Sequence, residues 1–411
     1  MAIGLGGLVL SVVVGTAIGI FMQKGRFCFV HALRDFIAFK DTRVTKGVVS
    51  AIGVTMLLWA GVATALGGAN WWTSSLSLFG IVGGIIFGVS MTYAGGCASG
   101  TLYRAGEGYV QFWITLVFMG VGYIVYSALF PTLSPVKSSL TFSEGFSLFE
   151  MGLPPIVMGV IGAGVIVVAY VVLVGREVTE SGGGVSGAES AQANMGVFGA
   201  GWNSFSQGTK SYISGFFNSE KSFGERMKEP WSAKTAGIGI GFVSIPWFVY
   251  LNTIDGYAGS YIAMTGPEVG WLALILNPIV DLQNVSLTGP FGYIAAFYQN
   301  NLSMGASNAV VPGAIAPPML LVASLVFGAF LASLWSGEFD VRMPKKKRVP
   351  NAVLGGLGMG VGSRMIPGCN IANIYSGLSM LTMNAVIGTV GMIIGVYIMT
   401  HWMYRDIGCE L

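Results

Sequence analysis

The chain has 411 residues, of which 53% are hydrophobic and 9% are charged, and its mean hydropathy is +0.71. Because soluble domains carry about 25% charged residues, this composition excludes a soluble protein and indicates a polytopic membrane protein. The net charge of +3 comes from basic residues spread over several loops, so no surface for nucleic acid is predicted.

Nine apolar stretches predict transmembrane helices, since a helix needs about 20 apolar residues to cross a hydrocarbon core of about 30 Å. They are residues 2–22, 44–66, 76–94, 110–130, 154–175, 235–251, 312–335, 351–365 and 385–402. The first stretch has no basic n-region and no small-residue cleavage site, so we expect it to be retained as a helix. The predicted fold is an all-α polytopic membrane protein with about nine transmembrane helices.

The positions of Lys and Arg predict the orientation, because cytoplasmic loops carry an excess of basic residues. With the N-terminus outside, 19 of the 21 Lys and Arg residues lie on the cytoplasmic side, and the exceptions are Lys137 and Arg364. Residues 252–311, which this topology places outside, contain no Lys or Arg. The pattern favours an outside N-terminus and a cytoplasmic C-terminus.

An internal repeat is visible when the sequence is shifted by 272 residues. This shift aligns GGIIFGVSMTYAGGCASGTLY (83–103) with GGLGMGVGSRMIPGCNIANIY (355–375), and seven of 21 positions match. Glycine-rich membrane helices resemble one another by composition, but here a cysteine and a tyrosine also match. We therefore predict two half-repeats, residues 1–175 and 235–411, that run in opposite directions through the bilayer, a common plan in transporters.

The two halves are separated by residues 176–234, which include the segment ESGGGVSGAESAQANMG and predict a cytoplasmic Gly/Ser-rich linker. Within the second half, residues 253–311 contain the apolar pieces GWLALILNPIVDL and GPFGYIAAFY. These pieces are too short to span the bilayer, so re-entrant or interfacial segments fit them best.

Two predicted helix breaks each carry a cysteine. Gly96 precedes Cys97 in YAGGCASG, and Gly368 follows a proline and precedes Cys369 and Asn370 in MIPGCN. Proline interrupts a helix, and the free amides at the next helix start carry a partial positive charge that binds anions. Irregular backbone inside a membrane is tolerated only where protein buries it or where it lines a polar cavity. We therefore expect each half to place a thiol at a polar pathway.

A third cysteine follows the first predicted span, in GIFMQKGRFCFVHALRDF. Cys28 and His31 are three residues apart, so a short helix would present the thiol and the imidazole on neighbouring faces. The basic residues that follow are typical of a juxtamembrane helix whose charged ends reach water. We expect His31 to support anion binding.

Three charged residues near the cysteines have different expected roles. Arg364 lies five residues before Cys369 in an otherwise uncharged span, where a charge costs ~2.5–3.5 kcal/mol on insertion scales. We favour an anion site for Arg364 over a structural ion pair, because no acidic residue is near it in sequence. In LYRAGEG, Arg104 and Glu107 are three residues apart, and we expect them to pair and to brace the Cys97 turn.

Enzyme chemistry has little support in the sequence. The chain has only two histidines, and its four cysteines include no C-x-x-C spacing, so we expect no metal, no cofactor and no enzyme activity. Cys409 lies in a polar tail and is interpreted as an incidental thiol. One alternative stays open, a membrane thiol–disulfide redox protein that uses Cys97 and Cys369, whose Cα atoms would need to be roughly 4.4–6.8 Å apart.

Three segments together resemble the YeeE/YedE family of sulfur-compound membrane transporters. They are QKGRFCFVHALRDF, GGCASGTLYRAGEG and RMPKKKRVPNAVLGG with GSRMIPGCNIA. The resemblance implies an inner-membrane protein with pseudo-twofold halves, short re-entrant helices and a central pathway lined by Cys28, Cys97 and Cys369. It also implies that the anion passes along these thiols through weak S–H contacts, without covalent turnover.

The family resemblance also suggests the substrate and a partner. Well-understood members take up thiosulfate, whereas the third segment is most similar to the YedE branch, which is linked to selenium metabolism. The expected substrate is thiosulfate or a related sulfur- or selenium-containing anion. Family members often work with a soluble TusA/SirA-like sulfur carrier, which here would be a separate protein. A further alternative makes the chain mainly a membrane partner of such a carrier.

Overall fold

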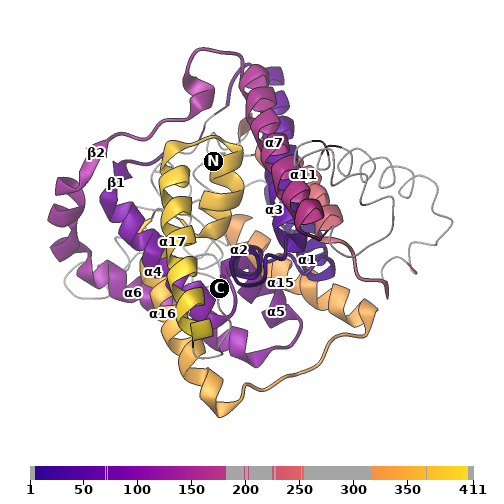
Figure 1. Cartoon of the computed structure of the whole chain (residues 1–411), viewed down its shortest axis with the longest axis vertical. Helices are drawn as coiled ribbons and strands as arrows, with labels where there is room; N and C mark the ends of the chain where they lie inside the picture. The colour runs from indigo at the N-terminus through magenta and orange to yellow at the C-terminus, as the bar shows by residue number, and fades with distance from the viewer. Residues whose placement is uncertain are drawn as a thin grey trace.

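The computed structural model describes residues 5–69, 71, 73–181, 199, 202, 225, 228–250, 252–253, 317–366 and 368–405. These residues are mostly helical (Figure 1). The α-helices are α1 (Leu5–Lys24), α2 (Phe29–Phe39), α3 (Arg43–Ala65), α4 (Leu78–Ala94), α5 (Ala98–Gly106), α6 (Val110–Ser139), α7 (Pro155–Ser181), α11 (Ala233–Tyr250), α15 (Pro317–Ser336), α16 (Val349–Met365) and α17 (Met383–Arg405).

The shorter elements lie at the ends of these helices. Strands β1 (Leu76–Ser77) and β2 (Thr141–Ser143) form an antiparallel pair, with Leu76 opposite Ser143. Leu148–Glu150 and Lys346–Arg348 are 3-10 turns, and Ile371–Gly377 is a π-helical segment.

The structure confirms an all-α, multi-pass membrane fold. A helix overlaps each of the nine ranges predicted as spans, and α2 and α5 are short additional helices. Among the described residues, five stretches are long and apolar enough to cross a membrane: Val9–Phe39, Arg43–Ala65, Leu78–Gly106, Pro155–Val172 and Met383–Arg405. Val110–Tyr123 and Leu320–Ser336 are shorter apolar helices. Most of the predicted linker and residues 254–311 of the predicted insertion lie outside the described residues.

The helices pack in two groups joined by α2 and α5 (Figure 1). In one group, α4 packs on α16 and α17, and α16 also packs on α6. In the other group, α1 packs on α11 and α15, while α3 packs on α7 and α11. The short helices connect the groups, because α2 contacts α3 and α17, and α5 contacts α6 and α15. The segments that carry Cys28 and Cys97 therefore lie between the two groups.

Glycines allow the helices of the first group to approach closely. A Cβ atom added at Gly84 of α4 would lie 2.8 Å from the Cα of Gly391 in α17. A Cβ added at Gly360 of α16 would lie 2.9 Å from the Cα of Gly122 in α6. Membrane helices associate through such small residues, since lipid supplies little hydrophobic drive between them.

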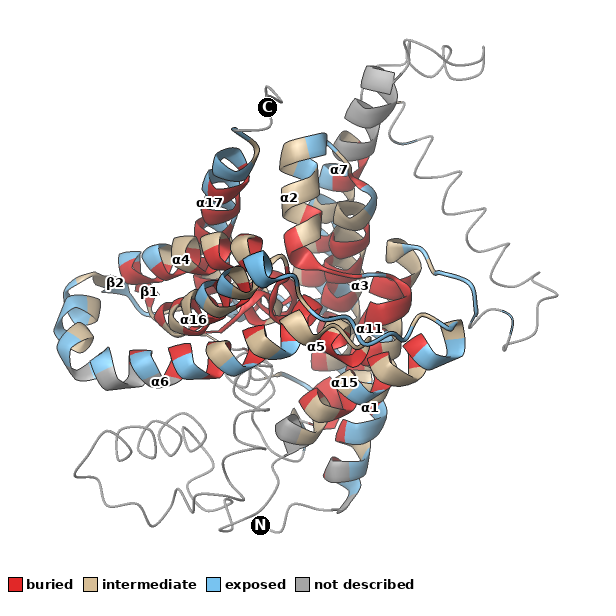
Figure 2. Ribbon diagram, turned by 90° about the horizontal axis from the view of Figure 1, so that it is seen from below, coloured by how far each residue is buried: buried red, intermediate tan, exposed pale blue. Residues whose placement is uncertain are grey.

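The outer faces of several helices are apolar. On α7, Val160 is 56% exposed and Val165 is 65% exposed. Exposed valines on a long apolar helix fit a surface that faces lipid rather than water. Buried residues are concentrated around α2, α3 and α5 (Figure 2). The interior of the bundle is therefore the place where polar groups can be protected from lipid.

Both predicted helix breaks are confirmed. Helix α4 ends at Ala94, and Gly95 follows it in a left-handed conformation with φ 76°, which favours glycine. Helix α16 ends at Met365, Gly368 has φ 104°, and the π-helical segment begins at Ile371. The proline to which the second break was attributed, Pro367, lies outside the described residues.

Candidate functional site

Two cysteines from different helices are in contact in the buried interior. The Sγ atoms of Cys28 and Cys97 lie 3.4 Å apart, and both residues are 0% exposed. Each cysteine is the N-cap residue of a helix, Cys28 of α2 and Cys97 of α5. The Cys97 Sγ atom accepts a hydrogen bond of 3.3 Å from the amide of Gly100. The two thiols therefore lie beside the positively polarised starts of two helices.

Gly100 makes the contact between the two sulfur atoms possible. A Cβ added at this position would lie 2.6 Å from the Cys28 Sγ atom and 3.2 Å from the Cys97 Sγ atom. No site role was predicted for Gly100, although it lies three residues after Cys97 in the motif YAGGCASG. Only the folded chain brings Cys28 to the same glycine.

Asn370, from the predicted second half-repeat, contacts the start of α5. The Asn370 side-chain oxygen accepts a hydrogen bond of 3.2 Å from the Ala98 amide, and its Nδ2 atom lies 3.5 Å from the Ser99 hydroxyl. The Ser99 Oγ atom lies 3.4 Å from the Cys97 Sγ atom. A series of contacts thus runs from Cys28 through Cys97 and Ser99 to Asn370, the neighbour of Cys369.

Cys369 is also 0% exposed, so all three motif cysteines are buried. Its carbonyl oxygen accepts a hydrogen bond of 3.1 Å from Asn373, whose Nδ2 atom also donates to the Gly368 carbonyl at 3.0 Å. These side-chain bonds support the backbone of the break, and the Cys369 carbonyl also accepts a hydrogen bond of 2.9 Å from the Asn373 amide. The redox alternative paired Cys97 with Cys369, but the thiol in contact with Cys97 belongs to Cys28.

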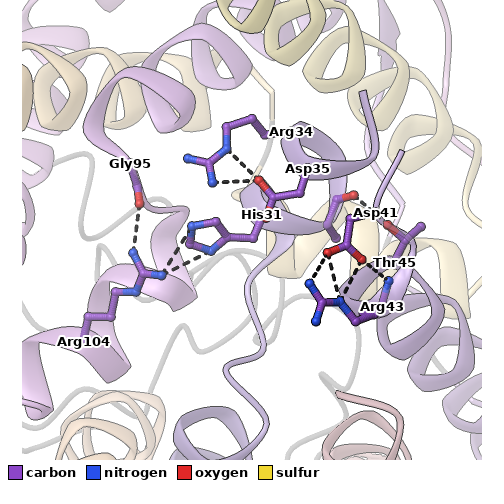
Figure 3. A network of polar contacts seen from close by, with 9 residues as sticks. His31, Arg34, Asp35, Asp41, Arg43, Thr45, Gly95 and Arg104 are labelled. Atoms are coloured by element: carbon purple, nitrogen blue, oxygen red, sulfur yellow. Dashed lines mark hydrogen bonds and ion pairs between the residues drawn. The ribbon is translucent and has the colours of Figure 1, made fainter. Parts of the chain in front are cut away.

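Arg104 and His31 contact each other (Figure 3), and His31 lies three residues after Cys28. The Arg104 Nη2 atom lies 3.2 Å from His31 Nδ1 and 3.4 Å from Nε2, and Nη1 donates to the Gly95 carbonyl at 3.1 Å. His31 is also within hydrogen-bond reach of the Cys28 thiol. Arg104 therefore contacts the turn before Cys97, as a brace would, but it does so through a backbone carbonyl.

Arg104 and Glu107, which were expected to pair, interact electrostatically but form no direct ion pair among the described residues. Among the described residues, the side chains bonded to Arg104 are His31 and the Tyr103 hydroxyl, and the Glu107 carboxylate is bonded to Gln23. Burial raises the pKa of the Glu107 carboxyl, which the nearby charge of Arg104 opposes. Helical spacing allowed the pair, but tertiary contacts with α1 and α2 took both side chains elsewhere.

Arg364 lies against an aromatic ring. Its guanidinium carbon is 3.7 Å from the centroid of the Tyr123 ring on α6, which is a cation–π contact. Neither sequence-based interpretation, an anion site or an ion pair, anticipated this ring. Tyr123 lies in a predicted span of the other half-repeat, so sequence distance alone gave no signal for the contact.

An aromatic cluster lies beside the second half-repeat. The hydroxyl of Tyr375 lies 2.8 Å from that of Thr55, and the rings of Trp59 and Phe248 stack with centroids 4.7 Å apart. Trp59 donates a hydrogen bond of 3.1 Å to Ser244. Tyr375 is one of the residues that match in the internal repeat, but its contact with α3 was not predicted.

The arrangement has limited chemical capacity. It presents weak S–H donors, amides at helix starts, and the guanidinium of Arg104 beside an imidazole. Within the described part of the chain, no three His, Cys, Asp or Glu side chains gather in a way that could hold a metal ion. Such groups can bind and pass a small anion.

Comparisons with known proteins agree with this picture. The chain is 27% identical over 402 residues to the thiosulfate transporter TsuA of Spirochaeta thermophila, covering 96% of this chain and 98% of the relative. It is 26% identical over 413 residues to the thiosulfate transporter TsuA of Escherichia coli, covering 96% and 94%. A protein named probable transporter YedE, from Escherichia coli, is 30% identical over 125 residues, 29% of this chain and 28% of the relative.

The similarity to the YedE protein thus covers less of the chain than the similarity to the thiosulfate transporters, which match over nearly its full length. The family model described as sulphur transport matches residues 24–398, which include all three motif cysteines and both helix breaks. The chain therefore belongs to the sulphur transport family, the YeeE/YedE family of membrane transporters.

Proposed function

We propose that this protein is an inner-membrane transporter that imports thiosulfate or a closely related sulfur- or selenium-containing anion. The observation that carries the proposal is the row of buried contacts from Cys28 through Cys97 and Ser99 to Asn370, beside Cys369. The names of the full-length relatives, thiosulfate transporters, support the choice of substrate.

The chemistry of this row suits a soft anion. Thiols are weak hydrogen-bond donors, so several in series can replace water around a sulfur atom without trapping it. The starts of α2 and α5 add fixed positive polarisation beside Cys28 and Cys97. Gly96 and Gly368 would shape the two breaks, and Asn370 would join them. Because the thiols are 0% exposed, passage of an anion requires the surrounding segments to move.

The proposed topology has nine crossings, an outside N-terminus and a cytoplasmic C-terminus. Loops assigned to the same side are hydrogen-bonded to one another, which supports it. On the cytoplasmic side the Trp231 amide donates to the Lys24 carbonyl at 3.0 Å, and on the outer side the Leu148 amide donates to the Leu381 carbonyl at 3.1 Å. The start of α1 and the end of α17 lie at opposite ends of the molecule (Figure 2).

The packing of the helices supports two halves related by a pseudo-twofold axis. Gly84 faces Gly391, with its added Cβ 2.8 Å from the Gly391 Cα. Shifting both positions by the repeat length, 84 + 272 = 356 and 391 − 272 = 119, gives Gly356 and Met119, and the added Cβ of Gly356 lies 3.1 Å from the Met119 nitrogen. Packing of α4 on α17 is thus matched by packing of α16 on α6.

The same shift places the meeting point of the halves on the proposed axis. Ala98 and Asn370 are equivalent positions, since 98 + 272 = 370, and they are hydrogen-bonded to each other. We infer that α5 and Ile371–Gly377 are re-entrant segments that enter from opposite sides and meet there. Cys97 and Cys369 would then be equivalent thiols on either side of the axis.

The experiment that tests the proposal is uptake of labelled thiosulfate by proteoliposomes that contain the purified protein. Alanine at Cys28, Cys97 or Cys369 should reduce uptake strongly while leaving membrane insertion intact, and Cys409→Ala is the matched control. Uptake that persists in all three variants would refute the thiol pathway. Wild-type uptake without any soluble partner would exclude the alternative that the chain is mainly a membrane partner of a TusA/SirA-like carrier.

Arg364 and His31 have supporting roles in this proposal. His31 would contact an anion at the Cys28 end, because it lies one helical turn after that thiol. Arg364 would contribute positive charge near Cys369 while its guanidinium is held on the Tyr123 ring. Measuring how strongly selenium-containing anions inhibit the uptake of labelled thiosulfate in the same assay would show whether sulfur or selenium is preferred.

A second candidate function is thiol–disulfide exchange, and the distance of 3.4 Å between the Cys28 and Cys97 sulfur atoms favours it. To form a disulfide, the two sulfur atoms would have to approach each other to the S–S bond length of about 2.05 Å. In that case mild oxidation of the purified protein would lower the number of thiols that react with a labelling reagent by two per chain, and reduction would restore both. Thiosulfate uptake that continues under a saturating reductant would separate transport from this redox reaction.

A further inference from the structure

Among the described residues, the Arg104 guanidinium has no carboxylate within hydrogen-bond distance, although the charge of Glu107 lies near it. Its Nε atom donates to the Tyr103 hydroxyl at 3.3 Å, Nη1 to the Gly95 carbonyl, and Nη2 contacts the His31 ring. These partners are neutral acceptors. Four other arginines form ion pairs with carboxylates, namely Arg26, Arg34, Arg43 and Arg342. The Glu107 carboxylate is hydrogen-bonded to Gln23.

Two aromatic rings lie beside the Arg104 guanidinium. Its guanidinium carbon lies 5.2 Å from the centroid of Phe112 and 5.8 Å from that of Tyr103. A guanidinium cannot lose its charge in a protein, and a charge taken from water is costly unless an opposite charge or a polar pathway compensates it. A brace for the Gly95 turn needs only one N–H donor. The Glu107 carboxylate acts on this charge without direct contact, so neither Glu107 nor the brace explains the N–H donors that remain.

The position of Arg104 supplies that explanation. His31 contacts the guanidinium, and it lies one helical turn after Cys28, within reach of that thiol. An anion that touches the Cys28 thiol therefore comes close to His31 and to the guanidinium that His31 contacts, and Figure 3 shows this contact between His31 and Arg104. Guanidinium has five N–H donors in a planar fork, and the contacts above leave the second N–H of Nη1 available for an oxyanion.

We propose that Arg104 and His31 form an oxyanion subsite at the Cys28 end of the thiol row, which selects anions with an oxyanion group at one end and a soft sulfur or selenium atom at the other. Arg104 and His31 bind the oxygen atoms, and Cys28 contacts the soft atom. This inference rests on the proposed transport of such anions and assigns to Arg104 a binding role in place of the brace expected from the sequence.

The subsite explains how two kinds of group can act on one small ion. Oxyanions are recognised by charge-assisted hydrogen bonds from arginine, which are about twice as strong as neutral ones. Thiols are weak donors and suit a polarisable atom instead. Sulfate lacks the soft atom and thiocyanate lacks the oxyanion group, so each engages only one half of the subsite.

The test compares Arg104→Gln, Arg104→Lys and His31→Gln in the proteoliposome uptake assay. The matched control is Arg26→Gln, because the Arg26 side chain is 71% exposed and pairs with Glu338. The expected result for Arg104→Gln is a rise of about tenfold or more in the KM for thiosulfate, with unchanged inhibition by thiocyanate. Arg104→Lys keeps the charge and should recover part of the affinity, while His31→Gln should give a smaller rise.

Three outcomes separate this subsite from the proposed function. If wild type transports thiosulfate and Arg104→Gln keeps its KM within twofold of the control, the subsite is refuted and the transport function stands. The subsite is also refuted if Arg104→Gln loses affinity for thiosulfate and thiocyanate equally, or if Arg104→Lys recovers none of the lost affinity. Either result assigns Arg104 to a structural role.

If wild type does not transport thiosulfate, the proposed function fails, and equilibrium binding to the purified protein decides the subsite. Thiosulfate binding that depends on Arg104 and is absent for sulfate would retain it. Binding that is equal in wild type and Arg104→Gln, or no binding in either, would overturn it. Elution of each variant as a monodisperse species in detergent verifies that the chain is folded.

Discussion

Replacing Gly100 by alanine tests whether the contact between the two thiols matters for transport. The added Cβ atom would lie 2.6 Å from the Cys28 Sγ atom and 3.2 Å from the Cys97 Sγ atom. Ordinary contacts between non-bonded heavy atoms are about 3.5–4.0 Å, so at least one sulfur has to move by about 1 Å. All three residues are buried, so no side chain can simply swing into solvent.

The magnitude follows from the cost of overpacking. An extra methyl group in a packed interior costs typically ~1–3 kcal/mol, and alanine gains up to about 1 kcal/mol over glycine in a helix. The net loss of stability should therefore be small. Strain of ~1–3 kcal/mol concentrated on the thiols corresponds to roughly a 5- to 150-fold loss of substrate affinity if the anion uses that contact.

The assay is thiosulfate uptake by proteoliposomes at several concentrations, together with thermal unfolding of the purified variant. Gly164→Ala on α7 is the matched control, because a Cβ added there meets nothing within 4 Å. Uptake by Gly100→Ala with the KM and maximal rate of the control would refute the idea that anions pass along touching thiols. A large drop in unfolding temperature would instead mean that Gly100 serves packing.

Three further predictions concern stability. Asn370→Ala leaves the buried amide of Ala98 without its acceptor, so thermal unfolding should report a loss of stability of about 1–3 kcal/mol. Asn370→Asp keeps an acceptor oxygen at the same place, so its loss of stability from this hydrogen bond should be smaller. Tyr123→Leu removes the ring beneath Arg364 and should destabilise by about 0.5–2 kcal/mol, which unchanged unfolding in detergent would contradict. The hydrogen bond from Arg43 lowers the pKa of Asp41, so its stabilisation is complete above the ordinary carboxyl pKa and is lost as pH falls through the lowered value. Asp41→Asn should thus reduce stability at neutral pH and make no difference in acid, and a reduction that is equal at both pH values would contradict this.

Local sequence was sufficient to predict the helix breaks. Two successive glycines, Gly95 and Gly96, favour the end of a helix. Gly95 caps α4 in the left-handed conformation, which glycine adopts without strain. The break before Cys369 was predicted from the proline at 367, because proline interrupts a helix. These features depend on residues within one turn of each other, which is the range over which backbone preferences act.

Pairing of charged side chains was less predictable. Arg104 and Glu107 have the spacing of a helical ion pair, but such a pair is worth only about 0.2–0.5 kcal/mol. Contacts with His31 from α2 and Gln23 from α1 compete easily with so small a gain. The contact of Arg364 with Tyr123 has the same origin, because two segments far apart in sequence meet only after α16 packs on α6.

The sequence by itself determined that the chain is an all-α membrane protein, where its helices lie and where two of them break. These properties follow from apolar length and from glycine, because lipid forces each segment to satisfy its own backbone. Only the tertiary structure decided which thiols touch, since the contact of Cys28 with Cys97 requires α2 and α5 to meet at Gly100. It also decided that Arg104 faces His31 and Cys28 rather than Glu107, because side chains three residues apart offer too little energy to resist the packing of whole helices.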